Sequence, residues 1–99
     1  PGISSGKVKI IEKMEDLSKI KKGDILVTKM TNPDMVVSMN KADAIVTDEG
    51  GITSHAAIVS REMGIPCIVG VTGFLKTLKS GDLIEMDGST GAIKILEDE

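Results

Sequence analysis

Three short apolar stretches, spaced by roughly twenty residues, constrain the fold of this chain more than any other feature. They lie at Ile25–Val27, Ala44–Val46 and Pro66–Val71, and segments with helix-start or helix-stop residues separate them. Uninterrupted apolar runs of this length are typical of strands buried on both faces of a sheet. Strands that alternate with helices predict an α/β domain.

The remaining elements follow from local signals. Asn32 can cap a helix that begins at Pro33, because proline suits the first helical position. A second helix is predicted from Ser54 to Met63, ending at Gly64. Further predictions are a strand over 7–11, a helical turn over 15–20, a strand over 24–28, a strand over 44–47, a short helix over 72–78, and a closing hairpin formed by 82–87 and 92–96.

Composition bounds the class of protein. A chain of 99 residues predicts one domain, large enough to form a core without metal or disulfide. Phe74 is the only aromatic residue and the formal net charge is −3, so the chain lacks the stacking platforms and the basic face that nucleic-acid binding requires. Cys67 is the only cysteine and is predicted to be a small buried thiol. With no stretch long enough to cross a membrane, we expect a cytoplasmic protein without a membrane partner.

The chemistry concentrates in the run Gly50-Gly51-Ile52-Thr53-Ser54-His55, which joins a predicted strand to a predicted helix. Ligands of open α/β sheets favour the crevice beyond the carboxyl ends of the strands. The paired glycines permit backbone angles closed to other residues, and Thr53 and Ser54 both suit the N-cap. His55 then falls in the first helical turn, where unpaired N–H groups and the positive end of the dipole favour an anion. A nucleophilic imidazole at this position can accept a phosphoryl group.

Plainer interpretations of the same residues stay open. His55 and Val59 share a helical face, so His55 could be a core histidine, and Thr53 and Ser54 could act only as caps. Arg61 lies on a different face from His55 and is predicted to be a surface or docking residue. The sequence has no second histidine, no clustered cysteines and no P-loop motif, so it offers neither a histidine-rich or thiolate metal site nor a P-loop nucleotide site.

Residues 50–61 resemble the phosphohistidine signature of the phosphoenolpyruvate-utilising enzymes. These include phosphoenolpyruvate synthase, pyruvate phosphate dikinase and the first enzyme of the sugar phosphotransferase system. The similarity continues through residues 24–71, the opening residues 1–8 and the closing residues 87–91, and it is greatest to the synthase branch. Ser54 stands where many synthases carry cysteine.

The resemblance implies that residues 1–99 form one mobile phosphohistidine domain with the swivelling β/β/α fold. It implies that His55 is the phosphoryl acceptor, that the Thr53 hydroxyl lies beside the phosphoryl group, and that Gly50 and Gly51 form the turn. Arg61 matches the arginine of the signature.

The resemblance also implies partners. In a complete synthase, a nucleotide-binding domain phosphorylates the histidine from ATP, and a barrel domain holds pyruvate or phosphoenolpyruvate with Mg²⁺. Neither fits within 99 residues, so this chain is expected to bind no cofactor itself and to act as a phosphotransferase only together with those domains. It would be a piece of a larger enzyme or a free-standing carrier. A dikinase or sugar phosphotransferase context remains an alternative, as does a non-catalytic docking or regulatory module of the same fold.

Overall fold

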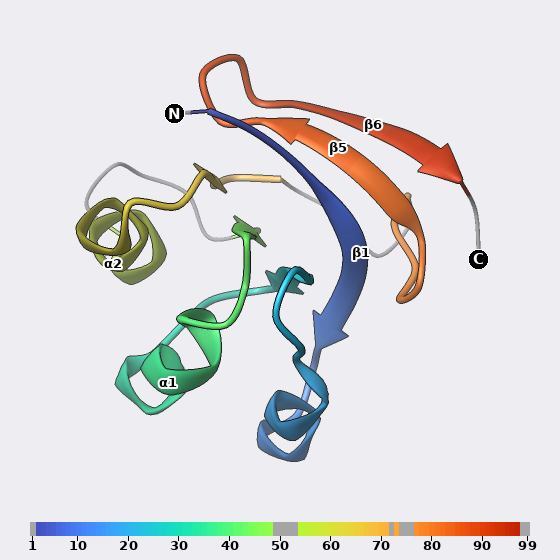
Figure 1. Ribbon diagram of the computed structural model, residues 1–99. Coiled ribbons are helices and arrows are strands. Elements are labelled where there is room, and N and C mark those ends of the chain that lie inside the picture. The colour runs from blue at the N-terminus through green and yellow to red at the C-terminus, as the bar shows by residue number, and fades with distance from the viewer. Residues whose placement is uncertain (1, 49–53, 72, 74–76, 98–99) are drawn as a thin grey trace.

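The chain folds as an α/β domain around one mixed, curled sheet (Figure 1). The computed structural model describes residues 2–48, 54–71, 73 and 77–97. The sheet has six strands in the order β4-β3-β2-β1-β5-β6. Strands β1 to β4 pair in parallel, and β5 and β6 form an antiparallel hairpin that continues the sheet from β1. The strand bounds are Ile3–Ile11 (β1), Ile25–Thr28 (β2), Ala44–Thr47 (β3), Cys67–Ile68 (β4), Leu83–Asp87 (β5) and Ala92–Glu97 (β6).

Helical segments connect the parallel strands, and they begin and end where capping residues allow. Their bounds are Met14–Lys19 (η1), Pro33–Met35 (η2), Val36–Met39 (α1) and His55–Met63 (α2). The Asn32 side chain caps η2 by accepting a hydrogen bond from the Asp34 N–H at 3.0 Å, as the sequence predicts. Gly64 ends α2 with a φ of 73°, a left-handed conformation that favours glycine.

Hydrophobic cores cover both faces of the parallel strands. Ile25 and Val27 of β2 point into one core, which also contains Ile84 and Met86 of β5 because the sheet curls. The intervening Leu26 points into the other core, which the helical segments cover. This alternation and the full burial of β2 and β3 confirm that the first two apolar stretches are strands buried on both faces, whereas the third is an edge strand.

The predicted elements at the edges of the sheet differ from those observed. Strand β1 starts at Ile3, because residues 3–7 pair with β5, a partner about eighty residues away that local sequence signals do not indicate. Strand β4 covers only Cys67–Ile68 of the predicted range 66–71, since proline and glycine flank this edge strand. Most of the helix predicted over 72–78 lies outside the described residues, and the described Gly73 and Thr77 are in turns.

Gly6 permits a close approach between β1 and the loop before β2. A Cβ atom at this position would clash with the carbonyl oxygen of Gly23, a backbone atom that cannot move aside alone. We expect Gly6→Ala to lower the free energy of unfolding by about 1–3 kcal/mol. Urea unfolding measures the effect. The exposed neighbour Ser5 provides the control, since Ser5→Ala should change stability by less than about 0.5 kcal/mol; equal effects of the two substitutions would contradict the steric explanation.

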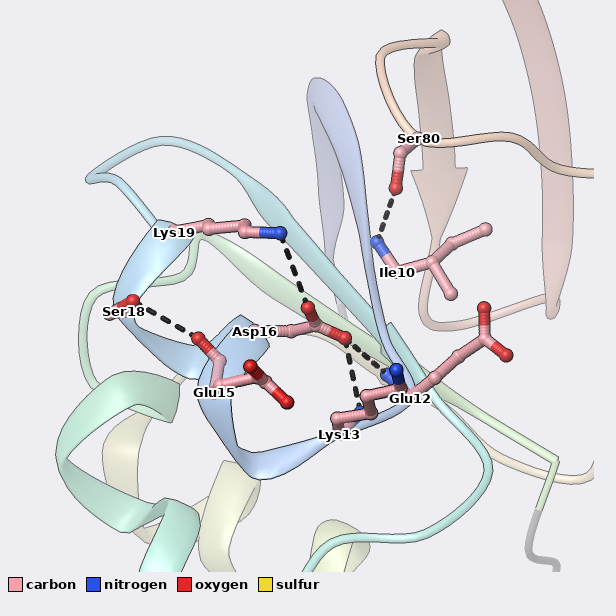
Figure 2. Close-up of polar contacts among 8 residues, drawn as sticks. All are labelled: Ile10, Glu12, Lys13, Glu15, Asp16, Ser18, Lys19 and Ser80. Atoms are coloured by element: carbon pink, nitrogen blue, oxygen red, sulfur yellow. Dashed lines mark hydrogen bonds and ion pairs between the residues drawn. The ribbon is translucent and has the colours of Figure 1, made fainter.

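The turn between β1 and η1 is fixed by one carboxylate (Figure 2). Asp16 Oδ2 accepts hydrogen bonds from the backbone N–H groups of Glu12 and Lys13, each at 3.1 Å. Its Oδ1 lies 3.3 Å from Lys19 Nζ. The two backbone hydrogen bonds, with a smaller contribution from Lys19, lower the pKa of Asp16 from its ordinary value of 3.8.

Because the folded-state pKa of Asp16 lies below the unfolded one, the ionised carboxylate stabilises the fold above pH 3.8, and this stabilisation is lost as the pH falls through the folded-state pKa. We therefore expect Asp16→Asn to destabilise the chain near neutral pH and to have a smaller effect in acid. Unfolding measured across that range checks this expectation. A wild-type-to-variant difference that does not change with pH would show that the carboxylate charge plays no part.

Candidate phosphoryl-acceptor site

The carboxyl ends of the parallel strands meet at one edge of the sheet, and the residues of interest gather there. Strands β2 and β3 end at Thr28 and Thr47, which pair with each other in register. The loop after β2 carries Thr31, and helix α2 begins with His55 in the connection that follows β3. This edge is where open α/β sheets bind ligands.

His55 is half-buried and is the first residue of α2. The preceding residue, Ser54, is the N-cap, and its side chain accepts a hydrogen bond from the Ala57 N–H at 3.3 Å. The first N–H groups of a helix have no carbonyl partners within it, and the dipole there is positive. An anion carried by the His55 ring would therefore lie near the electropositive end of a nine-residue helix.

Thr31 holds the His55 ring. Its Oγ1 lies 2.7 Å from His55 Nδ1, and the Thr31 residue is only 4% exposed. The loop that carries Thr31 is fixed on both sides, because the Thr28 hydroxyl donates to the Ile11 carbonyl at 3.0 Å and Asn32 caps η2. The position of the imidazole is thus set by a buried hydroxyl on a neighbouring strand connection.

This contact assigns different roles to the two ring nitrogens. Nδ1 is engaged by Thr31, whereas Nε2 of His55 makes no hydrogen bond with any residue in the described part of the chain. When Nδ1 carries the proton and donates it to Thr31 Oγ1, the Nε2 lone pair is free. The geometry therefore engages Nδ1 through Thr31 and leaves Nε2 without a hydrogen-bond partner among the described residues.

The predicted site residues fall into two groups. Ser54 and His55 lie where the sequence predicts, at the start of a helix beyond a strand end. Gly50, Gly51 and Thr53 lie outside the described residues.

Arg61 is exposed and lines a different pocket, together with Cys67 and Gly88. Thr31 is the functional candidate that sequence reasoning missed. The sequence showed only that Thr31 follows a buried strand. It reaches His55, 24 positions away, because β2 and β3 are adjacent and parallel.

Nothing in the described residues gathers three or more potential metal ligands among His, Cys, Asp and Glu. The helices within the same ranges are too short or too polar to cross a membrane.

Cys67 is half-buried rather than fully buried, and burial raises the pKa of its thiol above the ordinary value, outweighing a smaller opposing effect of the nearby Ser60 hydroxyl. That hydroxyl makes no hydrogen bond of accepted geometry within the described part of the chain. We expect the folded chain to react with iodoacetamide at neutral pH at least severalfold more slowly than the urea-unfolded chain, because the thiolate is the reactive form. Equal rates would show that the thiol is effectively exposed.

Comparison with known proteins identifies similar chains. Residues 20–91 match the family "PEP-utilising enzyme, mobile domain". The phosphoenolpyruvate synthase of Pyrococcus furiosus is 58% identical over 93 residues, which are 94% of this chain and 11% of that protein. A probable phosphoenolpyruvate synthase of Methanothermobacter thermautotrophicus is 55% identical over 93 residues, 94% of this chain and 14% of the relative. The chain thus spans only about a ninth to a seventh of the length of these relatives.

Solved structures show the same fold. An Enzyme I structure determined by NMR superposes with a TM-score of 0.68 and 32% sequence identity, covering 84% of this chain and 34% of that one. Thermococcus kodakaraensis aconitase X superposes with a TM-score of 0.70 over 97% of this chain and 92% of its own, but at 20% identity this likeness concerns the fold alone. The predicted fold class, a swivelling β/β/α phosphohistidine domain, is confirmed.

Proposed function

Because the chain belongs to the mobile-domain family of PEP-utilising enzymes, we propose that it carries a phosphoryl group on His55 Nε2 between two partner sites. The observation that carries this proposal is the 2.7 Å contact between Thr31 Oγ1 and His55 Nδ1. It occupies one ring nitrogen, fixes the ring at the start of α2, and leaves the other nitrogen without a partner among the described residues. A fully buried core histidine would need partners for both ring nitrogens, whereas the described residues engage only Nδ1.

The proposed transfer uses few groups of this chain. The Nε2 lone pair attacks the phosphorus of the donor, the N–P bond forms, and the P–O bond of the donor breaks with its electron pair remaining on the leaving oxygen. The ring gains positive charge, which the Thr31 oxygen stabilises by accepting the Nδ1 proton in a hydrogen bond. The phosphoryl oxygens would lie near the N-terminus of α2, at the positive end of its dipole. The reverse steps release the group to the second acceptor.

The phosphoryl donor and acceptor are proposed from the relatives. Phosphoenolpyruvate synthases are the named relatives, so ATP and the pyruvate/phosphoenolpyruvate pair are proposed as the two ends of the transfer. The nucleotide, the pyruvate and any Mg²⁺ would be bound by partner domains, and residues 1–99 would be the mobile domain between them. Within that domain, Gly50, Gly51 and Thr53 are proposed to complete the phosphoryl site. The resemblance of the signature supports their roles.

The proposal is tested by labelling. The chain is mixed with phosphoenolpyruvate and with the Pyrococcus furiosus synthase from which the matched 93-residue region has been deleted. We expect the chain to gain one acid-labile, base-stable phosphate, and NMR of the nitrogen-labelled ring should place it on Nε2. Attachment to Nδ1 would contradict the role given to Thr31, and the absence of label would contradict the proposed function.

A further inference from the structure

A second feature lies at the same edge of the sheet as His55. A pocket of about 400 Å³ opens at the carboxyl ends of β1 and β2. Lys13 and Met14 from the β1–η1 turn form one rim, Lys29 and Met30 from the loop after β2 form the other, and the largely buried Met35 lies beneath. We call this feature the methionine pocket.

The two rim methionines are unusually exposed for large apolar side chains. Met14 is 53% exposed and Met30 is 57% exposed, whereas Met35 is 3% exposed. Methionine is unbranched and polarisable, so an exposed pair can adapt its shape to an apolar group that enters between them. Exposed apolar side chains that line a hollow with polar neighbours are typical of a binding surface.

Part of the rim is held in place. Figure 2 shows the Asp16 carboxylate bonded to the backbone N–H groups of Glu12 and Lys13, which precede Met14. On the other side, the Thr28 hydroxyl also contacts the Met30 carbonyl at 3.4 Å. The backbone of both rims is therefore anchored, and adaptation is left to the side chains. A pre-formed backbone lowers the entropic cost of docking.

The pocket adjoins the phosphoryl-acceptor site through the loop after β2. Thr31 lies between Met30 and Asn32, both of which line the pocket, and its hydroxyl contacts His55 Nδ1. A protein surface that brings a phosphoryl group to His55 approaches this edge of the sheet. It would cover the methionine pocket in the same encounter.

The charges at the rim define the chemistry of the partner. Lys13 and Lys29 line the pocket and Glu12 is the only acidic residue there, so the rim is positive by one charge although the whole chain has a net charge of −3. A partner that complements this rim presents an apolar side chain bordered by carboxylates.

We propose that the methionine pocket is the docking surface for the partner domain that delivers the phosphoryl group of phosphoenolpyruvate to His55. That domain inserts an apolar side chain between Met14 and Met30 and places acidic side chains near Lys13 and Lys29. This inference rests on the proposed function, because it identifies the occupant by its approach to His55.

Docking is measured apart from transfer. The partner is the Pyrococcus furiosus synthase that lacks the matched 93-residue region, called here the deleted synthase. Calorimetry without phosphoenolpyruvate gives the Kd between the chain and this protein. Labelling in the presence of phosphoenolpyruvate gives the KM for the chain. Glutamine keeps the length of methionine but adds a polar amide. We expect the double variant Met14→Gln/Met30→Gln to raise both Kd and KM by about tenfold or more, while the labelling rate at saturation stays unchanged. The control Leu96→Gln, at an exposed apolar position on β6, should change neither value.

Charge reversal extends the test. Lys13→Glu/Lys29→Glu should also weaken binding, and added salt should weaken wild-type binding and reduce the difference between the two chains. An unchanged Kd in the methionine variant, or no measurable binding of the wild-type chain, would overturn the docking proposal. A lower saturating rate with an unchanged KM would also overturn it, because the pocket would then act on the histidine. Self-association of the wild-type chain that the methionine variant abolishes would identify a second copy as the occupant instead.

The two proposals fail in different ways. In one outcome the wild-type chain binds the deleted synthase, the methionine variant does not bind, and neither chain is labelled. That outcome would contradict the phosphoryl-carrier function but support the docking surface. Normal labelling of the chain, together with an unchanged Kd and KM in the methionine variant, would support the phosphoryl-carrier function and contradict the docking surface.

Discussion

Replacement of His55 by alanine is expected to abolish acid-labile labelling of the chain by phosphoenolpyruvate and the deleted synthase. The reason is that His55 provides the only imidazole in the chain. Without it, the chain has no imidazole nitrogen to attack the phosphorus of the donor. His55→Asn is a sharper variant, since the asparagine amide can still reach toward Thr31 but has no counterpart of Nε2. Incorporated phosphate, measured after separation of the chain from the synthase, should fall to background in both variants.

The control for this result is a charge change far from the site. Lys94 is exposed on β6, and Lys94→Ala should be labelled like the wild-type chain. Urea unfolding of the histidine variants shows whether the fold is retained. Labelling of a folded His55→Ala chain at the wild-type level would contradict the assignment of the acceptor.

The second large effect is expected at Thr31. Valine matches threonine in shape but has no hydroxyl, so Thr31→Val removes the contact with His55 Nδ1 and leaves the buried packing in place. One hydrogen bond of ordinary net strength corresponds to about a fivefold to tenfold loss of labelling rate. The ring should also lose its preference for the tautomer protonated at Nδ1, which the nitrogen NMR shifts of His55 report directly.

Serine provides the matched variant at this position. Thr31→Ser keeps a hydroxyl within reach of Nδ1 and should restore both the tautomer preference and most of the rate. A purely structural role for Thr31 would lower stability in the valine variant without changing the tautomer. An unchanged labelling rate and unchanged shifts in Thr31→Val would contradict the positioning role.

Local signals in the sequence predicted the elements that carry His55. The capping residue Ser54 and the αL glycine Gly64 fixed both ends of α2, and Asn32 fixed the start of η2. The buried strands β2 and β3 followed from apolar runs whose alternate residues enter different cores. These features depend on neighbours within a few residues, which is why sequence reasoning reaches them.

Features that depend on distant pairing were missed. The first half of β1 is a strand because it pairs with β5, and its own residues give no such signal. Thr31 becomes part of the site only because β2 and β3 are adjacent and parallel, so that the loops after them meet. The methionine pocket likewise requires the turn after β1 beside the loop after β2. Knowledge of the strand order would have brought all three within reach.

A carrier must release the phosphoryl group from His55 as readily as it accepts the group. The radiolabelled phosphorylated chain is purified from its donor and mixed in a single turnover with the deleted synthase and unlabelled pyruvate. We expect the label to leave the chain and appear in phosphoenolpyruvate. Label that stays on the chain, or that is released only as inorganic phosphate, would contradict its role as a carrier.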